Sequence, residues 1–270
     1  MTSDEDITSV NCNTLRSVAG NNISPDEIIP LTVLSEGQTD VGKKRLHNED
    51  SFYSSDDKCL WFVADGMGGH NAGDFASQSL VNDAEAFFSP SDSIEESAEK
   101  IEAIIQQTNL NLINKASTIT GDTIIGATIA LLISKDNQGI ALWAGDSRIY
   151  RIRSGNIEQL TTDHSLVNDM IKENIIKPEE AETHPEKNKI TRAVGHDKDL
   201  ILDYRKLSIL PGDRYVVCSD GLTKELSDEE ILSIAGNGST TTTNQTLMQQ
   251  AIEKGGRDNV TSITIDFFKG

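Results

Sequence analysis

The 270-residue chain has few cysteines and no pattern that would pair them. Cys12, Cys59 and Cys218 are an odd number without CxxC spacing, which favours free thiols and a reducing compartment over a disulfide scaffold. No apolar run approaches the roughly 20 residues of a membrane-spanning helix. The acidic, polar N-terminus lacks the pattern of a secretory signal. We therefore expect a cytoplasmic protein with no membrane partner.

Positive charge is also scarce, with 24 Lys and Arg against 43 Asp and Glu, and the formal net charge is −19. A nucleic-acid backbone is bound by basic side chains that displace its counterions, so nucleic acid is not an expected partner. The excess of carboxylates can instead hold a hard divalent cation. With 36% hydrophobic residues, the chain is too apolar for general disorder and long enough to bury an ample core.

Short apolar runs and two segments of helical spacing make up most of the chain. Helices are expected over residues 72–88 and 94–116, where apolar side chains recur near helical intervals. Turn signals alone separate several apolar runs, which favours hairpins, and an α+β fold with antiparallel sheet and helices outside it. The expected strands are 60–64, 128–133, 140–144, 149–153, 215–218 and 262–267.

Two polar stretches fall outside this pattern. Residues 1–30 show no sustained period, and we interpret them as a flexible or loosely docked extension before one domain over residues 31–270. Residues 236–246, GNGSTTTTNQT, are of low complexity, and we expect a surface loop there.

Aspartate recurs where apolar strands end. A small residue, then Asp, then Gly or Ser is the pattern at Asp65, Asp146 and Asp220. One such Asp is usually a turn former. Several at matching strand ends would meet at one rim of a sheet, where unpaired like charges are costly to desolvate and a cation would join them. Asp258 and the pair Glu49-Asp50 extend the set, and oxygen ligands of this kind suit Mg²⁺ or Mn²⁺.

Taken in order, these motifs resemble the metal-dependent protein phosphatases, the type 2C serine/threonine phosphatases, in their compact bacterial form. Each motif is weak alone, but the ordered set is specific and spans about residues 36–267. The resemblance implies a four-layer α-β-β-α sandwich of two antiparallel sheets flanked by helices. The motifs are TDVG (39–42), RLHNEDS (45–51), VADGMGGH (63–70), GAT (126–128), GDSR (145–148), LTTDHS (160–165), HP (184–185), NKITRAVG (188–195), SDGL (219–222) and GRDNVT (256–261).

The resemblance also implies an activity for residues 31–270: hydrolysis of phosphoserine and phosphothreonine in proteins by direct attack of a water that bridges two divalent metals. Mn²⁺ and Mg²⁺ are both expected cofactors, and Asp65 would bridge the two ions. The positions that match the family's metal ligands are Glu49, Asp50, Asp65, Gly66 through its carbonyl, Asp220 and Asp258.

Further positions take roles around these ligands. Arg45 would hold the phosphate dianion with its planar fork, and Asp146 would orient ligands or metal waters. Asp122 would help to bind a third ion, although the family more often has Gly-Thr-Thr where this chain has GAT, and a plain loop aspartate is the alternative. Met67 stands where eukaryotic members often carry a histidine, so His70 is the nearest candidate proton donor; a solvated loop histidine is the alternative.

Residues 163–195 correspond to the family's mobile flap beside the active site. The implied partners are phosphorylated proteins that a Ser/Thr kinase modifies, and a monomer is expected. Two other functions stay open. A phosphoprotein-binding module with a damaged metal site would lack one of Asp65, Asp220, Asp258 or Arg45, all of which are present. An acidic cation-binding protein without catalysis leaves Arg45 unexplained.

Overall fold

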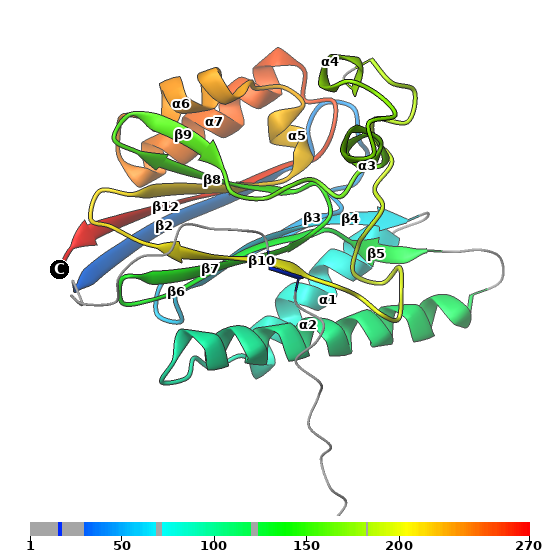
Figure 1. The fold of residues 1–270 in the computed structure, drawn as a ribbon, viewed down its shortest axis with the longest axis horizontal. Helices are drawn as coiled ribbons and strands as arrows, with labels where there is room; N and C mark the ends of the chain where they lie inside the picture. The colour runs from blue at the N-terminus through cyan, green and yellow to red at the C-terminus, as the bar shows by residue number, and fades with distance from the viewer. Residues whose placement is uncertain (1–15, 18–29, 69–71, 120–123, 182) are drawn as a thin grey trace, which may run out of the picture.

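The computed structural model describes residues 16–17, 30–68, 72–119, 124–181 and 183–270. Two β-sheets lie face to face, and helices cover both outer faces (Figure 1). The α-β-β-α sandwich expected from the sequence is therefore confirmed. In the described ranges, no helix combines the length and the apolar character that crossing a membrane requires.

The first sheet has the strand order β1-β10-β7-β6-β4-β3, with β5 paired to β4. Its neighbours are antiparallel except β1 and β10, which run parallel. Its strands are β1 (Arg16–Ser17), β3 (Asp50–Ser55), β4 (Leu60–Gly68), β5 (Ile125–Ala127), β6 (Ile129–Lys135), β7 (Gln138–Ala144) and β10 (Asp203–Ser208).

The second sheet has the order β2-β12-β11-β8-β9 and is antiparallel throughout. The strands of this second sheet are β2 (Leu31–Asp40), β8 (Arg148–Arg153), β9 (Asn156–Gln159), β11 (Arg214–Cys218) and β12 (Val260–Lys269). Every strand expected from the sequence lies in one of the two sheets.

Alternating side chains on β4 show how the layers form. Leu60, Phe62 and Ala64 belong to the core beneath the helices α1 and α2, whereas Trp61 and Val63 belong to the core between the two sheets. Successive residues of a strand point to opposite faces, so one apolar strand serves both cores. A third core joins the second sheet to α5, α6 and α7. The helices are α1 (Ala72–Phe87), α2 (Ile94–Ser117), α3 (Leu166–Lys172), α4 (Pro178–Ala181), α5 (Asp220–Thr223), α6 (Asp228–Ala235) and α7 (Thr240–Lys254).

The expected surface loop at 236–246 is wrong in its second half, because α7 begins at Thr240. The Ser239 side chain accepts a hydrogen bond from the backbone N–H of Thr242 and caps the helix. Thr240 is buried and donates to Asp266, and Asn244 accepts hydrogen bonds from the second sheet. Packing against that sheet therefore outweighs the low helix propensity of a threonine run.

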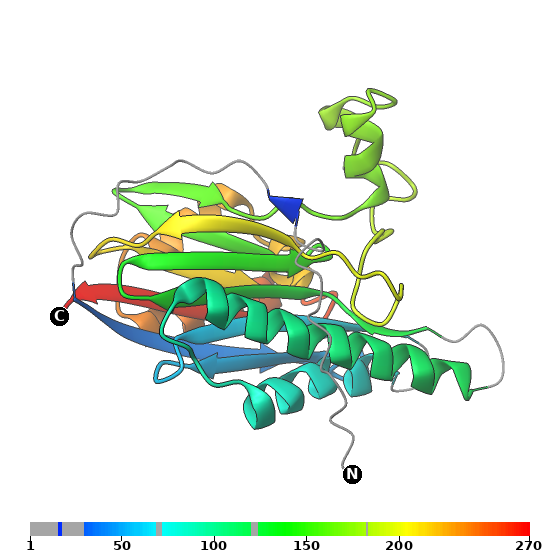
Figure 2. The same ribbon diagram turned by 60° about the horizontal axis from the view of Figure 1, so that its bottom comes forward.

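An excursion of the chain over residues 163–195 carries α3 and α4. It stands out from one end of the sandwich, as the yellow-green segment of Figure 2, and lies beside α5 in Figure 1. An isolated bridge between Ser165 and Ile190 joins the two ends of the excursion to each other. The bridge between Ala127 and Val194 and the hydrogen bond from the His164 N–H to the Gly145 carbonyl fix these ends to the sandwich. Its expected mobility stays a prediction, as does the domain boundary at residue 30.

Candidate active site

Strand register brings the first two carboxylates together. Asp50 begins β3 and lies directly opposite Asp65 of β4 in the antiparallel pair. Like charges at opposed positions destabilise a sheet unless something compensates them. Asp50 Oδ2 accepts hydrogen bonds from Ser219 Oγ at 2.8 Å and Thr261 Oγ1 at 2.7 Å. Because both donors belong to strand ends of the second sheet, Asp50 links the two sheets at this end of the sandwich.

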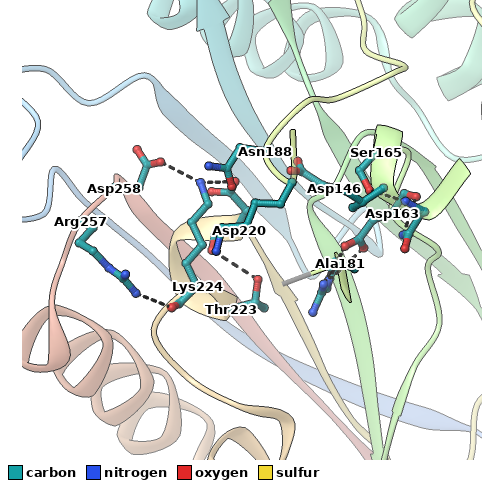
Figure 3. A pocket seen from close by; sticks show the side chains of 14 residues that line it. Asp146, Asp163, Ser165, Ala181, Asn188, Asp220, Thr223, Lys224, Arg257 and Asp258 are labelled. Carbon is teal, nitrogen blue, oxygen red and sulfur yellow. Dashed lines mark hydrogen bonds and ion pairs between the residues drawn. The ribbon is translucent and has the colours of Figure 1, made fainter. Parts of the chain in front are cut away.

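The remaining acidic residues come from the second sheet and its turns. Asp146 lies in the turn between β7 and β8, Asp220 begins α5 directly after β11, and Asp258 precedes β12. These three line a cavity of about 400 Å³ whose other wall includes Asn168 and Asn188 of the excursion (Figure 3). We call Asp50, Asp65, Asp146, Asp220 and Asp258 the carboxylate cluster. It places the aspartates singled out in the sequence at one end of the fold.

The carboxylate cluster is electrostatically strained. Burial, together with the nearby charge of Asp220, raises the pKa of Asp50 and that of Asp146 to about 7. Desolvation, followed by the charges of Asp50 and Asp220, raises the pKa of Asp65 well above its ordinary value. Desolvation and like charges both disfavour ionised carboxylates. A bound cation would remove this penalty.

Three oxygens of the cluster have no hydrogen-bond partner although solvent does not reach them: Asp50 Oδ1, Asp146 Oδ1 and Asp220 Oδ1. Buried acceptors are normally satisfied, and each exception needs an explanation. Hard divalent cations are bound by oxygen donors of this kind, so the donor set fits Mg²⁺ or Mn²⁺. Within the described residues, however, no group of three or more His, Cys, Asp or Glu side chains is arranged to hold a metal ion as it stands.

Cations of the protein itself lie against the cluster. Lys224 Nζ is 2.5 Å from Asp220 Oδ2 and 3.0 Å from Asp258 Oδ2. Arg45 also pairs with Asp258, with Nε 2.8 Å from Oδ1 and Nη2 3.0 Å from Oδ2. Burial alone would raise the pKa of Asp258, but Lys224 and Arg45 outweigh it and lower that pKa. Asp258 is therefore the carboxylate of the cluster that the protein itself compensates best.

Glu49 is held by its backbone. Its N–H donates to Asn259 Oδ1 at 2.9 Å, and its carbonyl accepts from the Gly66 N–H at 3.1 Å. The Asn259 amide also donates to the carbonyls of Val41 and His47, each at 3.0 Å, which fixes the loop before β3. Burial raises the pKa of the Glu49 carboxyl. The loop thus holds Glu49 and Arg45 at the rim of the cluster.

Gly66 allows this close approach. A Cβ at Gly66 would lie 2.2 Å from the Gly73 carbonyl oxygen and 2.4 Å from that of Glu49. Both contacts are with backbone atoms, which cannot turn aside as a side chain can. The glycine after Asp65 is therefore required by the packing of the site, whatever its carbonyl binds.

The turn that carries Asp146 is tied to the base of the excursion. His164 Nδ1 accepts a hydrogen bond from the Gly145 N–H at 3.1 Å, and His164 Nε2 lies 3.2 Å from Asp203 Oδ2. Arg148 donates two hydrogen bonds to the Asp163 carboxylate, from Nε to Oδ1 at 3.0 Å and from Nη2 to Oδ2 at 2.7 Å. The position of Asp146 therefore depends on the two residues that begin the excursion.

The structure thus gathers Arg45, Glu49, Asp50, Asp65, Gly66, Asp146, Asp220 and Asp258 at one end of the sandwich. His70 and Asp122 lie outside the described residues, so their expected roles stay predictions. Lys224 was missed as a site residue. The sequence did contain an indication of this role, because Lys224 stands four residues after Asp220 and so lies one helical turn further on.

Comparison with known proteins agrees with this geometry. The family model described as protein phosphatase 2C matches residues 39–254. Protein phosphatase PhpP of Streptococcus pneumoniae is 36% identical over 231 residues, which cover 83% of this chain and 93% of PhpP.

Solved structures of similar fold lead to the same group of proteins. The Mycobacterium tuberculosis serine/threonine phosphatase PstP/Ppp has a TM-score of 0.79 and 31% identity, over 88% of this chain and 99% of that one. A structure of the PstP catalytic domain, described as a complex with two manganese ions, has a TM-score of 0.78 and 31% identity over the same shares.

Proposed function

Since the chain belongs to the protein phosphatase 2C family of serine/threonine protein phosphatases, we propose that it hydrolyses phosphoserine and phosphothreonine in proteins at the carboxylate cluster, with two divalent metal ions. The observation that carries this proposal is the set of three shielded carboxylate oxygens without partners, on strand ends of both sheets. Carboxylate oxygens placed in this way are suitable ligands for a hard divalent cation. The two manganese ions of the PstP catalytic domain support the same number of ions here.

The residues proposed to hold the ions are those that the fold brings to this end, and either Mn²⁺ or Mg²⁺ suits them. Asp65 would serve both ions, and Asp122 a third. When bound, the ions would acidify the water that attacks phosphorus and neutralise charge on the phosphoryl oxygens. The proposed ligands are Glu49, Asp50, Asp65, Gly66, Asp220 and Asp258.

Arg45 is proposed to hold the phosphate. Its guanidinium already makes a two-pronged contact with the carboxylate of Asp258, and the same fork fits two oxygens of a phosphate. The Arg45 side chain is 51% exposed, so it can turn from Asp258 toward a substrate without breaking core packing. This exchange would bring the substrate phosphate to the edge of the cluster.

Asp146 is proposed to orient groups bound at the cluster rather than to contact phosphorus. Its backbone is fixed through Gly145 and His164, and its Oδ1 is shielded and without a partner. The cavity between the cluster and the excursion would receive the phosphorylated side chain. His70 remains the proposed proton donor to the leaving alkoxide. Phosphorylated proteins as partners, a monomeric state and a cytoplasmic location also stay proposals.

Phosphate release from a phosphothreonine peptide tests the proposal, measured with Mn²⁺, with Mg²⁺ and with EDTA. We expect turnover with either metal and none with EDTA. Asp220→Ala should abolish turnover, and Arg45→Ala should raise KM, since it removes a contact to the phosphate. Asp57→Ala is the matched control, because this exposed aspartate lies in the turn at the other end of the β3–β4 hairpin.

Two outcomes would contradict the proposal. One is metal-independent turnover that survives Asp220→Ala. The other is folded protein that binds Mn²⁺ yet releases no phosphate with any metal, which would favour a phosphoprotein-binding module on the same fold.

A further inference from the structure

Lys224 occupies a position that the proposed metal chemistry has not used. It follows α5 directly and stands one turn beyond Asp220, so its side chain lies along the same side of the short helix. Its ammonium bridges Asp220, the first residue of α5, and Asp258, in the turn before β12, at 2.5 Å and 3.0 Å (Figure 3). The protein therefore already places one cation between two of the proposed metal ligands.

The ammonium is well held there. Its side chain is only 33% exposed, and the carboxylates that it joins are 14% and 18% exposed. A lysine ammonium paired with two carboxylates is positively charged, so Lys224 places a full positive charge at this point.

A divalent ion needs the same two carboxylates. Lys224 pairs with Oδ2 of both Asp220 and Asp258, and Arg45 contacts both oxygens of Asp258. Of these four oxygens, only Asp220 Oδ1 is left without a partner. Like charges a few ångström apart repel strongly where solvent is partly excluded. An ion that binds both carboxylates would therefore sit against the ammonium unless the ammonium withdraws. The flexible four-carbon stem of lysine permits such a withdrawal into the adjoining cavity.

We propose that Lys224 is an internal competitor for the divalent cation, so that a metal ion binds Asp220 and Asp258 only as the Lys224 ammonium leaves them. This inference rests on the proposed metal site and specifies how that site is regulated. In the metal-free protein Lys224 balances part of the cluster's negative charge. In the metal-bound protein it is displaced, and the metal affinity of this chain is lower than the same carboxylates would give alone.

Titration calorimetry with Mn²⁺ on the full chain tests the inference directly. We expect Lys224→Ala to lower the Mn²⁺ dissociation constant by about tenfold, since one competing charge is removed. Lys224→Arg retains the charge and should stay within about twofold of the wild type. Lys206→Ala is the matched control. It also removes one lysine from an ion pair, with Glu95 at 2.6 Å, away from the cluster.

Thermal unfolding supplies a second readout that does not need activity. Without metal, Lys224→Ala should melt below the wild type, because the cluster loses its counter-charge. With saturating Mn²⁺, its melting temperature should rise by more than that of the wild type. Lys224→Gln keeps a long polar side chain without the charge and should behave as Lys224→Ala does, which separates charge from packing.

The failures of this inference and of the metal site are distinguishable. If the wild type binds Mn²⁺ and releases phosphate, but Lys224→Ala binds Mn²⁺ equally or more weakly, only the inference is overturned. If neither the wild type nor any variant binds Mn²⁺ or releases phosphate, the proposed metal site is wrong and the inference that rests on it is wrong as well.

Discussion

Single residues set how closely separate backbone segments approach one another at the site. Gly66 has backbone carbonyls on both sides of the space that a Cβ would fill. Asn259 fixes three backbone groups of the loop that carries Arg45 and Glu49. Such residues contact no substrate, but the carboxylate cluster depends on them because its members come from separate strands and turns.

Gly66→Ala should destabilise the protein by about 3 kcal/mol, because the added methyl group overlaps two backbone carbonyls. Urea unfolding of the metal-free protein measures the change. Gly155→Ala is the comparison, since its Cβ would meet nothing within 4 Å and only its positive φ of 76° is unfavourable, which should cost about 1 kcal/mol. An equal loss in both variants would contradict the overlap at Gly66.

Asp203 should make stability depend on acid pH. Burial disfavours its charge, but the hydrogen bonds from His164 and Arg192 outweigh burial and lower the Asp203 pKa below its ordinary value. A lowered folded pKa means stability that is present above the unfolded pKa and lost as pH falls through the folded value.

Relative to Asp203→Asn, the wild type should therefore gain about 1–3 kcal/mol near pH 6, and this gain should shrink below about pH 4. Urea unfolding at pH 6, 5, 4 and 3 measures it. Asp199→Asn, at an exposed aspartate nearby, should stay within about 0.5 kcal/mol of the wild type at each pH. A gain that grows toward pH 3 would reverse the sign and contradict the assignment.

At the scale of elements, α7 shows tertiary packing overriding local composition. Its first turn is a run of threonines, and its stability comes from the Ser239 cap and from the buried face that contacts the second sheet. A polar, low-complexity stretch gives no apolar period to read, so this helix start could not be predicted from the sequence.

Removing the cap should weaken this helix measurably. Ser239→Ala should lower the free energy of unfolding by about 1 kcal/mol, because the Thr242 N–H loses its acceptor. Thermal or urea unfolding measures the loss. Thr246→Ala, at a partly exposed position of the same helix, should leave stability unchanged or slightly raised. A loss at Thr246 equal to that at Ser239 would argue against the cap.

Other elements followed the sequence more closely. The strands of the cores were predicted because their apolar runs face two cores at once, as β4 does. The edge strands β2 and β9 carry mixed burial, so no comparable run marks them. Asp65, Asp146 and Asp220 of the cluster were predicted for the same reason as the core strands, since they stand where those strands end. Asp50 instead begins a strand and Asp258 precedes one, and the order of the motifs identified them. Lys224 was not, because an acid and a lysine four residues apart usually form a solvated surface pair.

At the scale of the whole molecule, the cluster joins both sheets at one end, so its charge balance bears on global stability. Asp50 links the sheets through Ser219 and Thr261. A ligand that binds only the folded state stabilises it by mass action, by about 2.7 kcal/mol when its concentration is a hundred times its dissociation constant. Metal binding should therefore be visible in the unfolding of the entire domain.

Saturating Mn²⁺ should raise the melting temperature by about 5–10 °C over protein in EDTA, given the size of the domain. Calorimetric or fluorescence melting measures the shift, with NaCl added to equal ionic strength as the reference. Asp220→Ala should lose most of this shift and Asp57→Ala should keep it. A shift of equal size in both variants would place the stabilising metal elsewhere.

The short parallel strand β1 has a consequence for encounters between copies of the chain. Among the described residues, β1 pairs only with Asp203 and Tyr204 of β10, and the rest of that strand's outer edge has no described neighbour. Two of the few basic residues, Arg205 and Lys206, stand on this uncovered part. Charged side chains on an edge strand discourage the addition of a foreign strand. The charges of Arg205 and Lys206 therefore oppose the edge-to-edge strand pairing between molecules that leads to aggregation.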